Sequence, residues 1–294
     1  MDEVVANSEE SIAKGSKSFA AAARIFDRET RDDCVMLYAW CRHCDDVIDG
    51  QEGGREQAAD FRTGQVQRLA ELRRQTDAAL AGNPEGPVFE ALARVCARRN
   101  IPAIYPHQLL DGFAMDVEER QYRTTDDLLD YCYHVAGVVG VMMAQIMGVS
   151  DPRILDRASD LGIAMQLTNI SRDVIEDAQA GRVYLPTMMQ VTGHRDQWPE
   201  LHRMALELLD MAEVYYDSAM VGMAALPPRS ALAIAAARRV YRAIGVKLRK
   251  GPDQWATRVS TTKPEKALLF AAAAWDVARP KPNIPRTGLY QRPS

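Results

Sequence analysis

The residues that could carry chemistry are gathered in two short acidic stretches with similar spacing, residues 41–49 and 169–177. Each helical residue turns the chain by about 100°, so polar residues at i, i+4, i+7 and i+11 share a narrow arc of a helix. We call such a row of polar residues a stripe. The first stripe consists of Tyr38, Arg42, Asp45 and Asp49. A second stripe, at i, i+3, i+7 and i+11, consists of Gln166, Asn169, Asp173 and Asp177. The spacing therefore predicts two helices that each carry an acidic stripe.

Apolar residues flank both stripes, among them Trp40 and Ile48 in the first and Ile170 and Val174 in the second. A row of carboxylates on a mostly buried helix costs free energy unless a cation meets it. Paired aspartates that face a second pair suit Mg²⁺, which takes one or two carboxylates and completes its shell with phosphate oxygens. The pattern therefore predicts a magnesium site for a diphosphate ligand.

Two arginines lie within the same acidic stretches, Arg42 in the first and Arg172 in the second. A guanidinium group can bind phosphate oxygens by two parallel hydrogen bonds. We therefore expect both side chains to contact the diphosphate directly.

The composition is that of a globular protein of 294 residues, 47% of them hydrophobic and 26% charged. No clear linker divides the chain, which predicts one domain over residues 1–279 followed by a Pro-rich, extended or mobile tail over 280–294. The net charge of −4, the pI near 5.8 and the absence of a long basic run argue against a nucleic-acid-binding protein.

The first ten residues are acidic and lack the apolar segment of a signal peptide, which predicts a cytoplasmic protein. The five cysteines form no disulfide-type pattern, in keeping with a reducing compartment. Cys41 and Cys44 form a CxxC pair around His43, but a zinc site would need a second pair of ligands at similar spacing. We therefore interpret these cysteines as small buried residues.

Residues 131–150 contain no Asp, Glu, Lys or Arg and are long enough to span a bilayer. Several glycines, the acidic flanks Asp130 and Asp151, and the lack of a positive cluster favour a central helix of a large bundle instead. Small residues around Gly137 and Gly140 would let a neighbouring helix or a lipid-like chain approach closely.

No convincing alternating strand appears, so the predicted fold class is all-α. Expected helices cover approximately residues 1–14, 30–49, 55–81, 88–99, 103–119, 131–150, 152–178, 197–224, 228–249 and 264–275. Asp111 and Asp116 are five residues apart and share a helix face less well than the stripe residues do. An ordinary solvated helix surface is therefore as good an interpretation of this pair as a binding site. At the break before the second helix, Ser16, Lys17 and Ser18 could be a plain N-cap or could bind a phosphate.

The sequence resembles the squalene/phytoene synthase family from Ser16 to about Lys266. The resembling segments, in chain order, are residues 16–19, 38–49, 111–116, 131–140, 166–177 and 181–186, the last reading Gly-Arg-Val-Tyr-Leu-Pro. Each segment alone is a weak signal, but their occurrence in this order is specific. Within the family, residues 36–49 and 131–148 are most similar to bacterial phytoene synthases.

The resemblance implies an isoprenoid-synthase helical bundle with a central hydrophobic cavity for prenyl chains. Carried over residue by residue, it implies Mg²⁺ (or Mn²⁺) ligands at Asp45, Asp49, Asn169, Asp173 and Asp177. It implies substrate contacts from Ser16, Lys17, Ser18, Tyr38, Arg42, Gln166, Arg172, Tyr241 and Arg258. It also implies catalytic roles for Tyr131, Arg172 and Tyr241.

The implied reaction joins two geranylgeranyl diphosphates head to head through prephytoene diphosphate, releasing diphosphate and giving phytoene without NADPH, as in carotenoid biosynthesis. Mg²⁺ and arginines would neutralise the leaving diphosphate. Water would quench each carbocation, so the uncharged helix that begins near Tyr131 would supply an apolar wall. The protons lost in the reaction could be accepted by a tyrosine hydroxyl or by the released diphosphate, and the sequence does not choose between them.

Several alternatives remain open at this point. Alanines at 20–23 and Val35 would leave room in a tunnel for the longer prenyl chain, whereas a sister enzyme would use farnesyl diphosphate to make dehydrosqualene or presqualene diphosphate. A catalytically silent helical assembly factor is a third reading, although such a protein would have no reason to keep both stripes and their arginines. Weak peripheral membrane association, suggested by the insoluble product, and contact with partner enzymes of the carotenoid pathway are further hypotheses.

Overall fold

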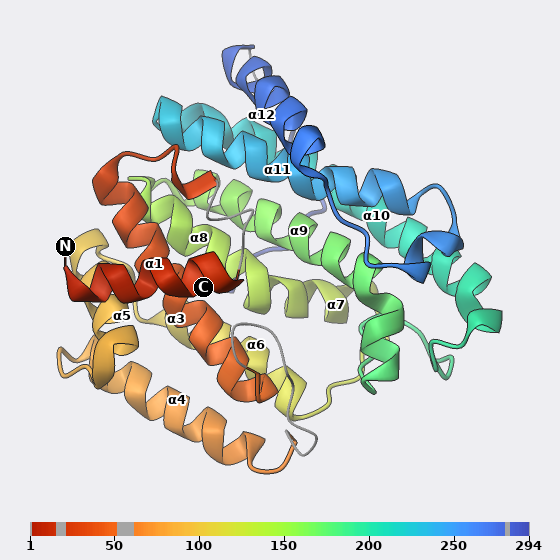
Figure 1. Ribbon diagram of the computed structural model, residues 1–294, viewed down its shortest axis with the longest axis horizontal. Helices are drawn as coiled ribbons and strands as arrows, with labels where there is room; N and C mark the ends of the chain where they lie inside the picture. Colours follow the sequence, from red (N-terminus) through yellow and green to blue (C-terminus); the bar gives the residue numbers. More distant parts are fainter. Residues whose placement is uncertain (1, 16–21, 52–61, 280–282, 294) are drawn as a thin grey trace. The chain divides into compact units, whose positions relative to one another are not determined.

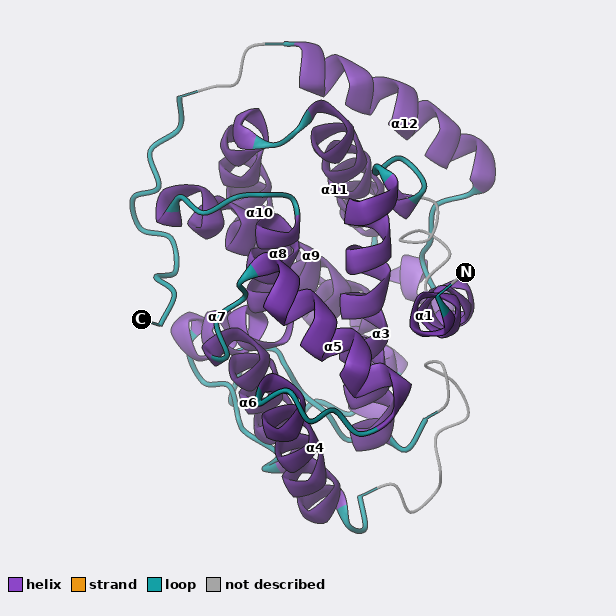
Figure 2. Ribbon diagram, turned by 90° about the vertical axis from the view of Figure 1, so that its left-hand side faces the viewer, coloured by secondary structure: helices purple, strands orange, loops and turns teal. Residues whose placement is uncertain are grey.

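The computed structural model describes residues 2–15, 22–51, 62–279 and 283–293. Every regular element in these ranges is helical, so the all-α prediction is confirmed for the described chain (Figure 2). The chain divides into two compact units. Unit 1 contains residues 1–118 and 141–150, and unit 2 contains residues 119–140 and 151–294. The single-domain assignment stays a prediction.

Unit 1 is built on α3, which carries the first stripe and contacts the other helices of the N-terminal part (Figure 1). Asp27 caps its first turn by accepting a hydrogen bond from the Thr30 amide, and Gly50 ends it in the left-handed conformation at φ 59°. Trp40 and Ile48 are fully buried, so the apolar flanks of the stripe form core, as predicted. The helices are α1 (Glu3–Gly15), α3 (Arg28–Asp49), α4 (Gln65–Leu80), α5 (Gly86–Arg99) and α6 (Ile104–Val117).

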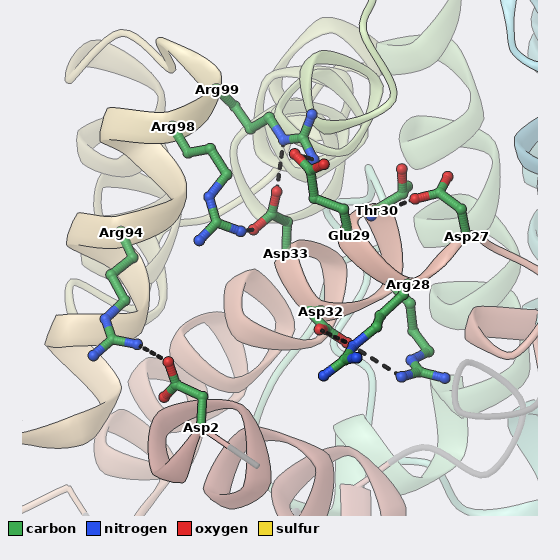
Figure 3. A network of polar contacts seen from close by, with 11 residues as sticks. Asp2, Asp27, Arg28, Glu29, Thr30, Asp32, Asp33, Arg94, Arg98 and Arg99 are labelled. Carbon is green, nitrogen blue, oxygen red and sulfur yellow. Dashed lines mark hydrogen bonds and ion pairs between the residues drawn. The ribbon is translucent and has the colours of Figure 1, made fainter.

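A buried carboxylate holds α3 against α5 in unit 1 (Figure 3). Asp33 is inaccessible to solvent and accepts hydrogen bonds from Arg98 at 2.8 Å and Arg99 at 2.6 Å. Burial raises the pKa of Asp33, and the two guanidinium groups oppose that rise. Asp2, just before α1, accepts a hydrogen bond from Arg94 on α5 (Figure 3). Ionic contacts therefore tie three helices of this unit together.

Unit 2 is built on the long helix α9 (Pro152–Gln179), which carries the second stripe. It contacts α7 (Thr125–Cys132), the π-helical turn η1 (Tyr133–Gly137), α10 (Trp198–Gly222) and α11 (Pro228–Leu248). The short helices η2 (Arg195–Gln197), η3 (Met223–Ala225) and η4 (Pro252–Ala256) lie in the connections. The last helix, α12 (Lys263–Ala278), packs along α11 (Figure 1). Helix α8 (Val138–Ile146) begins in unit 2 and ends in unit 1.

The uncharged segment 131–150 is helical without a break as far as Ile146, and the π-helical turn η1 lies within this helical run, between α7 and α8. None of the helices in the described ranges combines the length and apolar character that crossing a bilayer requires. The small residues of this segment pack against a neighbouring helix. Of the two predicted neighbours, a helix or a lipid-like chain, the structure shows the helix. A Cβ added to Gly162 of α9 would lie 2.6 Å from the Ala136 carbonyl carbon and 2.8 Å from the Gly137 Cα. Backbone therefore packs directly on backbone where η1 crosses α9.

The C-terminal segment 283–293 has no regular secondary structure, but side-chain contacts hold it on unit 2. Arg286 donates two hydrogen bonds to Asp160 of α9, at 2.9 and 3.0 Å, and Asp160 is inaccessible to solvent. The Tyr290 hydroxyl donates to Asp130 of α7 at 2.8 Å, and Arg292 pairs with Asp156 at 2.6 Å. The expected tail is therefore extended, and it contributes ionic contacts to the fold of unit 2.

We predict that Gly162→Ala destabilises the protein by about 3 kcal/mol, because the new methyl group meets backbone atoms that cannot move aside. Gly245→Ala in α11 is the matched control. Its methyl group would meet only the flexible end of Leu209, and alanine favours the helix. Urea unfolding followed by circular dichroism measures both variants, and equal loss of stability would contradict close packing at Gly162.

We also predict that Arg286→Ala lowers the free energy of unfolding by about 3–5 kcal/mol, because it leaves the buried Asp160 carboxylate without its bidentate partner. Arg292→Ala is the control, since its partner Asp156 keeps 26% of its side-chain exposure and water can replace the ion pair. That variant should lose about 1 kcal/mol or less. Similar losses in the two variants, measured by the same unfolding experiment, would contradict the role assigned to Arg286.

Candidate active site

The first stripe is assembled on α3 in unit 1, where its side chains remain partly accessible. The Arg42 guanidinium donates a hydrogen bond to Asp45 at 2.5 Å and lies 3.5 Å from Asp46. It also interacts with Tyr38. Burial opposes the charge on Arg42, but Asp45 and Tyr38 hold its pKa above the ordinary value. Arg42 is therefore a fixed cation beside the aspartates.

Asp45 lies in a strongly anionic environment. Its side chain keeps 38% of its exposure, yet loss of water around the carboxyl group raises its pKa to about 7. Arg42 opposes this rise, while the nearby carboxylates of Asp49, Asp46 and Asp116 add to it. The negative charge at this site exceeds what Arg42 neutralises, so a further cation would stabilise it.

Asp116 of α6 is a candidate site residue whose position in the sequence did not distinguish it from Asp111. It lies close enough to Asp45 to raise its pKa, and α6 packs against α3 in unit 1. Asp111, in contrast, pairs with Arg73 of α4 at 2.7 Å, as an ordinary helix surface would. The motif 111–116 was visible in the sequence, but only the packing of α6 shows that its two aspartates have different surroundings.

The second stripe lies on α9 in unit 2 and has its own arginine. Arg172 donates to Asp173 from Nε at 2.8 Å, and 14% of the Arg172 side chain is exposed. Burial opposes the charge on Arg172, and Asp173 holds its pKa above the ordinary value. The Asn169 amide nitrogen lies 3.4 Å from the Gln166 side-chain oxygen, while the buried Asn169 Oδ1 has no hydrogen-bond partner. An unpaired buried oxygen among carboxylates suits a cation.

Two predicted site residues from outside α9 interact with the second stripe or with its arginine. Arg258, in the loop after η4, donates to Asp173 at 3.1 Å and to Glu176 at 2.5 Å. Tyr241 of α11 interacts electrostatically with Arg172. Asp177 lies one turn beyond Asp173 on the same helix and is partly buried. Unit 2 thus gathers the whole second stripe with two arginines and a tyrosine.

Tyr131 is buried in an aromatic cluster of unit 2 that the sequence did not predict. Its ring stacks on Tyr184 with the centroids 4.9 Å apart, and the Tyr122 ring lies 5.2 Å from it. Its neighbour Asp130 accepts hydrogen bonds from Tyr290 and from Arg120. The motif Gly-Arg-Val-Tyr-Leu-Pro contains Tyr184, but sequence position alone assigned that residue no role.

The CxxC cysteines of α3 are largely withdrawn from solvent. Cys44 is buried and Cys41 half-buried, and burial raises the pKa of both thiols, that of Cys41 to about 12. The His43 ring packs against the edge of Phe89. Across the described ranges, no three His, Cys, Asp or Glu side chains converge in the manner of a preformed metal centre. Ser16, Lys17 and Ser18 lie outside the described residues.

The donor set fits Mg²⁺ better than zinc, because the stripes offer carboxylate and amide oxygens and no thiolate or imidazole. The oxygen donors of the first stripe are Asp45 and Asp49 in unit 1, and those of the second stripe include Asn169, Asp173 and Asp177 in unit 2. Neither group completes the shell of a metal ion alone. This is typical of Mg²⁺ sites whose remaining ligands are water and phosphate oxygens.

In the described residues, which are helical throughout their regular elements, α3 and α9 each carry aspartates beside an arginine, an arrangement that suits binding of a phosphate group together with a cation. The family model described as squalene/phytoene synthase matches residues 12–265. The 15-cis-phytoene synthase of Paracoccus sp. (strain N81106 / MBIC 01143) is 53% identical over 100% of this chain and 99% of the relative. The 15-cis-phytoene synthase of Pantoea ananas is 50% identical over 97% of this chain and 96% of the relative. The chain belongs to the squalene/phytoene synthase family.

Solved structures agree with this assignment. A crystal structure of a dehydrosqualene synthase in complex with a ligand superposes with a TM-score of 0.78 at 28% sequence identity. The match covers 92% of this chain and 95% of that one. The described chain therefore has the helical fold of this group of synthases, as the sequence resemblance implied.

Proposed function

We propose that this protein is a phytoene synthase, a prenyltransferase that condenses two geranylgeranyl diphosphates head to head to phytoene. The observation that carries the proposal is the identity of 53% with a 15-cis-phytoene synthase over the whole chain. The partly exposed aspartates and arginines on α3 and α9 support it, because ionisation of a prenyl diphosphate requires the leaving group to be neutralised.

The ligands that we propose for Mg²⁺ are Asp45, Asp49, Asn169, Asp173 and Asp177. The raised pKa of Asp45 and the unpaired Asn169 Oδ1 support this choice, since each would gain from a bound cation. Bound Mg²⁺ would supply Lewis-acid stabilisation of charge on the departing diphosphate.

The substrate contacts that we propose come from residues around the two stripes. Arg42 and Arg172 keep 25% and 14% of their side-chain exposure, so each can reach a ligand while its charge stays fixed by an aspartate. Arg258 is more exposed, at 55%, and can exchange its contacts to Glu176 and Asp173 for phosphate oxygens. Tyr38, Gln166 and Tyr241 lie beside these groups, and Ser16, Lys17 and Ser18 complete the proposed set.

The aromatic cluster of Tyr131, Tyr184 and Tyr122 would shield the reacting carbons from water. Tyr131 and Tyr122 are both about 4% exposed, and ring faces of this kind stabilise cations electrostatically. We assign Tyr131 to this apolar part of the site, with Tyr241 and Arg172 at its polar end. For the longer chain, we propose that the small side chains Ala22, Ala23 and Val35, which are buried, line the part of the site that takes the geranylgeranyl groups, while Ala20 and Ala21 lie outside the described residues.

The first test is a product assay. Purified protein is incubated with Mg²⁺ and either geranylgeranyl or farnesyl diphosphate, without NADPH, and the hydrocarbons are identified by mass spectrometry. We expect phytoene from the longer substrate. A product from farnesyl diphosphate alone would make the protein a dehydrosqualene or presqualene diphosphate synthase, and no turnover by folded protein would favour the assembly-factor alternative.

The second test concerns the stripes. Asp45→Asn and Asp173→Asn should each lower kcat at least about 100-fold, because each removes charge that would hold Mg²⁺ against the leaving group. They should also raise the Mg²⁺ concentration required for half-maximal rate. Asp210→Asn is the matched control, since Asp210 is 71% exposed and pairs only with Arg249 among the contacts described. Wild-type kinetics in both stripe variants would refute the proposed ligand set.

A further inference from the structure

Helix α12 presents a wide apolar surface to solvent. Leu268 and Trp275 keep 73% and 68% of their exposure, unusually high values for large apolar side chains. At about 100° per residue, they fall in one arc with exposed small residues between them. The residues of this arc, here called the outer arc, are Pro264, Ala267, Leu268, Ala271, Ala274, Trp275 and Ala278.

The opposite side of α12 already has its partner. Phe270 and Val277 pack against a buried cluster that contains Ala273 of the same helix and Ala235 and Ala236 of α11. The outer arc is therefore not required for folding of the helix onto α11. Among the described residues, the inner side of α12 packs on α11 and on Met220 and Met223, whereas the outer arc stays exposed, so two apolar sides indicate a second contact partner.

The charges around the outer arc favour an anionic partner. Lys263 borders it at the start of the helix, and Arg279, just beyond the end, is 46% exposed while it pairs with Asp276 at 3.3 Å. The acidic residues of α12 are already neutralised, since Glu265 accepts a hydrogen bond from Lys247 at 2.7 Å and Asp276 binds Arg239 of α11. Asp276 is shared by Arg239 and Arg279, so the charges around the outer arc sum to a positive value that would attract a negative surface.

The size of the outer arc argues against stable self-association. Two large side chains and several alanines on one helix expose on the order of 500 Å², below the roughly 800 Å² that each partner contributes to a standard protein interface. Leucine and tryptophan bordered by basic residues are instead typical of helices that lie in the membrane interface, with tryptophan at the level of the headgroups.

We propose that the outer arc of α12 docks the protein on a lipid bilayer that contains anionic headgroups. The inference is compatible with the proposed function, on which its biological purpose rests, because a prenyl diphosphate is an amphiphile and phytoene is a hydrocarbon. The docking itself depends only on the surface of α12.

The first experiment measures binding to vesicles of phosphatidylglycerol and phosphatidylcholine by sedimentation. The double variant Leu268→Gln, Trp275→Gln should bind at least about tenfold more weakly than the wild type, because binding scales with the apolar area inserted. Val66→Gln is the matched control, since Val66 is 67% exposed on α4, away from α12 in the chain. Vesicles of phosphatidylcholine alone should bind the wild type more weakly, and added salt should reduce binding to the anionic vesicles.

A second variant, Trp275→Phe, tests whether the Trp275 ring itself enters the bilayer, because this change keeps an apolar ring at the position. Trp275 is the most exposed tryptophan, whereas Trp40 is fully buried and the other two are partly buried. Wild-type fluorescence should therefore shift to shorter wavelength when anionic vesicles are added. Trp275→Phe should keep vesicle binding within about twofold, since the ring remains apolar, but lose the spectral shift.

Activity assays keep this proposal separate from the proposed function. The double variant should turn over substrate dispersed in detergent at the wild-type rate. With substrate embedded in anionic vesicles, its rate should be lower than that of the wild type. Failure of both proteins to turn over substrate would refute the function without affecting the vesicle result. Three outcomes would overturn membrane docking: no binding by the wild type, equal binding by the double variant, or a wild-type dimer in sedimentation equilibrium that the double variant loses.

Discussion

Compensation of carboxylate charge inside helical packing is the constraint on which both the fold and the site depend. In the scaffold, buried aspartates accept hydrogen bonds from arginines of other elements: Asp33 of α3 from α5, and Asp160 of α9 from the C-terminal segment. Each of these carboxylates is inaccessible to solvent, so losing its arginine would leave a charge without water. Such pairs hold helices together.

The site aspartates are compensated differently. Asp45 and Asp173 pair first with arginines of their own helices, three residues and one residue away, and keep 38% and 16% of their side-chain exposure. A pair within one helix holds no two elements together, and the one contact from another element, Arg258 to Asp173, comes from a 55% exposed side chain, so these hydrogen bonds can be exchanged for a ligand without loosening the fold. The same chemistry thus stabilises the scaffold where it joins elements and remains available for binding where it does not.

Close helix packing and the C-terminal segment together position the second stripe in unit 2. Gly162 brings α9 against the π-helical turn, and Arg286 and Tyr290 fasten the chain end to α9 and α7. Tyr290 binds Asp130, the residue before Tyr131, so the chain end also supports the aromatic cluster. The proline-rich composition of this segment suggested an extended or mobile tail, because composition does not show which arginine will meet a buried aspartate.

The sequence by itself determined the all-α class, the two stripes and most helix boundaries, because these follow from helical periodicity and from local signals such as Asp27 and Gly50. Tertiary structure decided which neighbours each side chain received. It brought the charge of Asp116 within electrostatic reach of Asp45, stacked Tyr184 on Tyr131, and left Leu268 and Trp275 exposed on a helix whose other side is buried. The physical reason is that pKa shifts, ring stacking and exposure arise from residues distant in sequence, whereas periodicity and capping arise within a few turns of one helix.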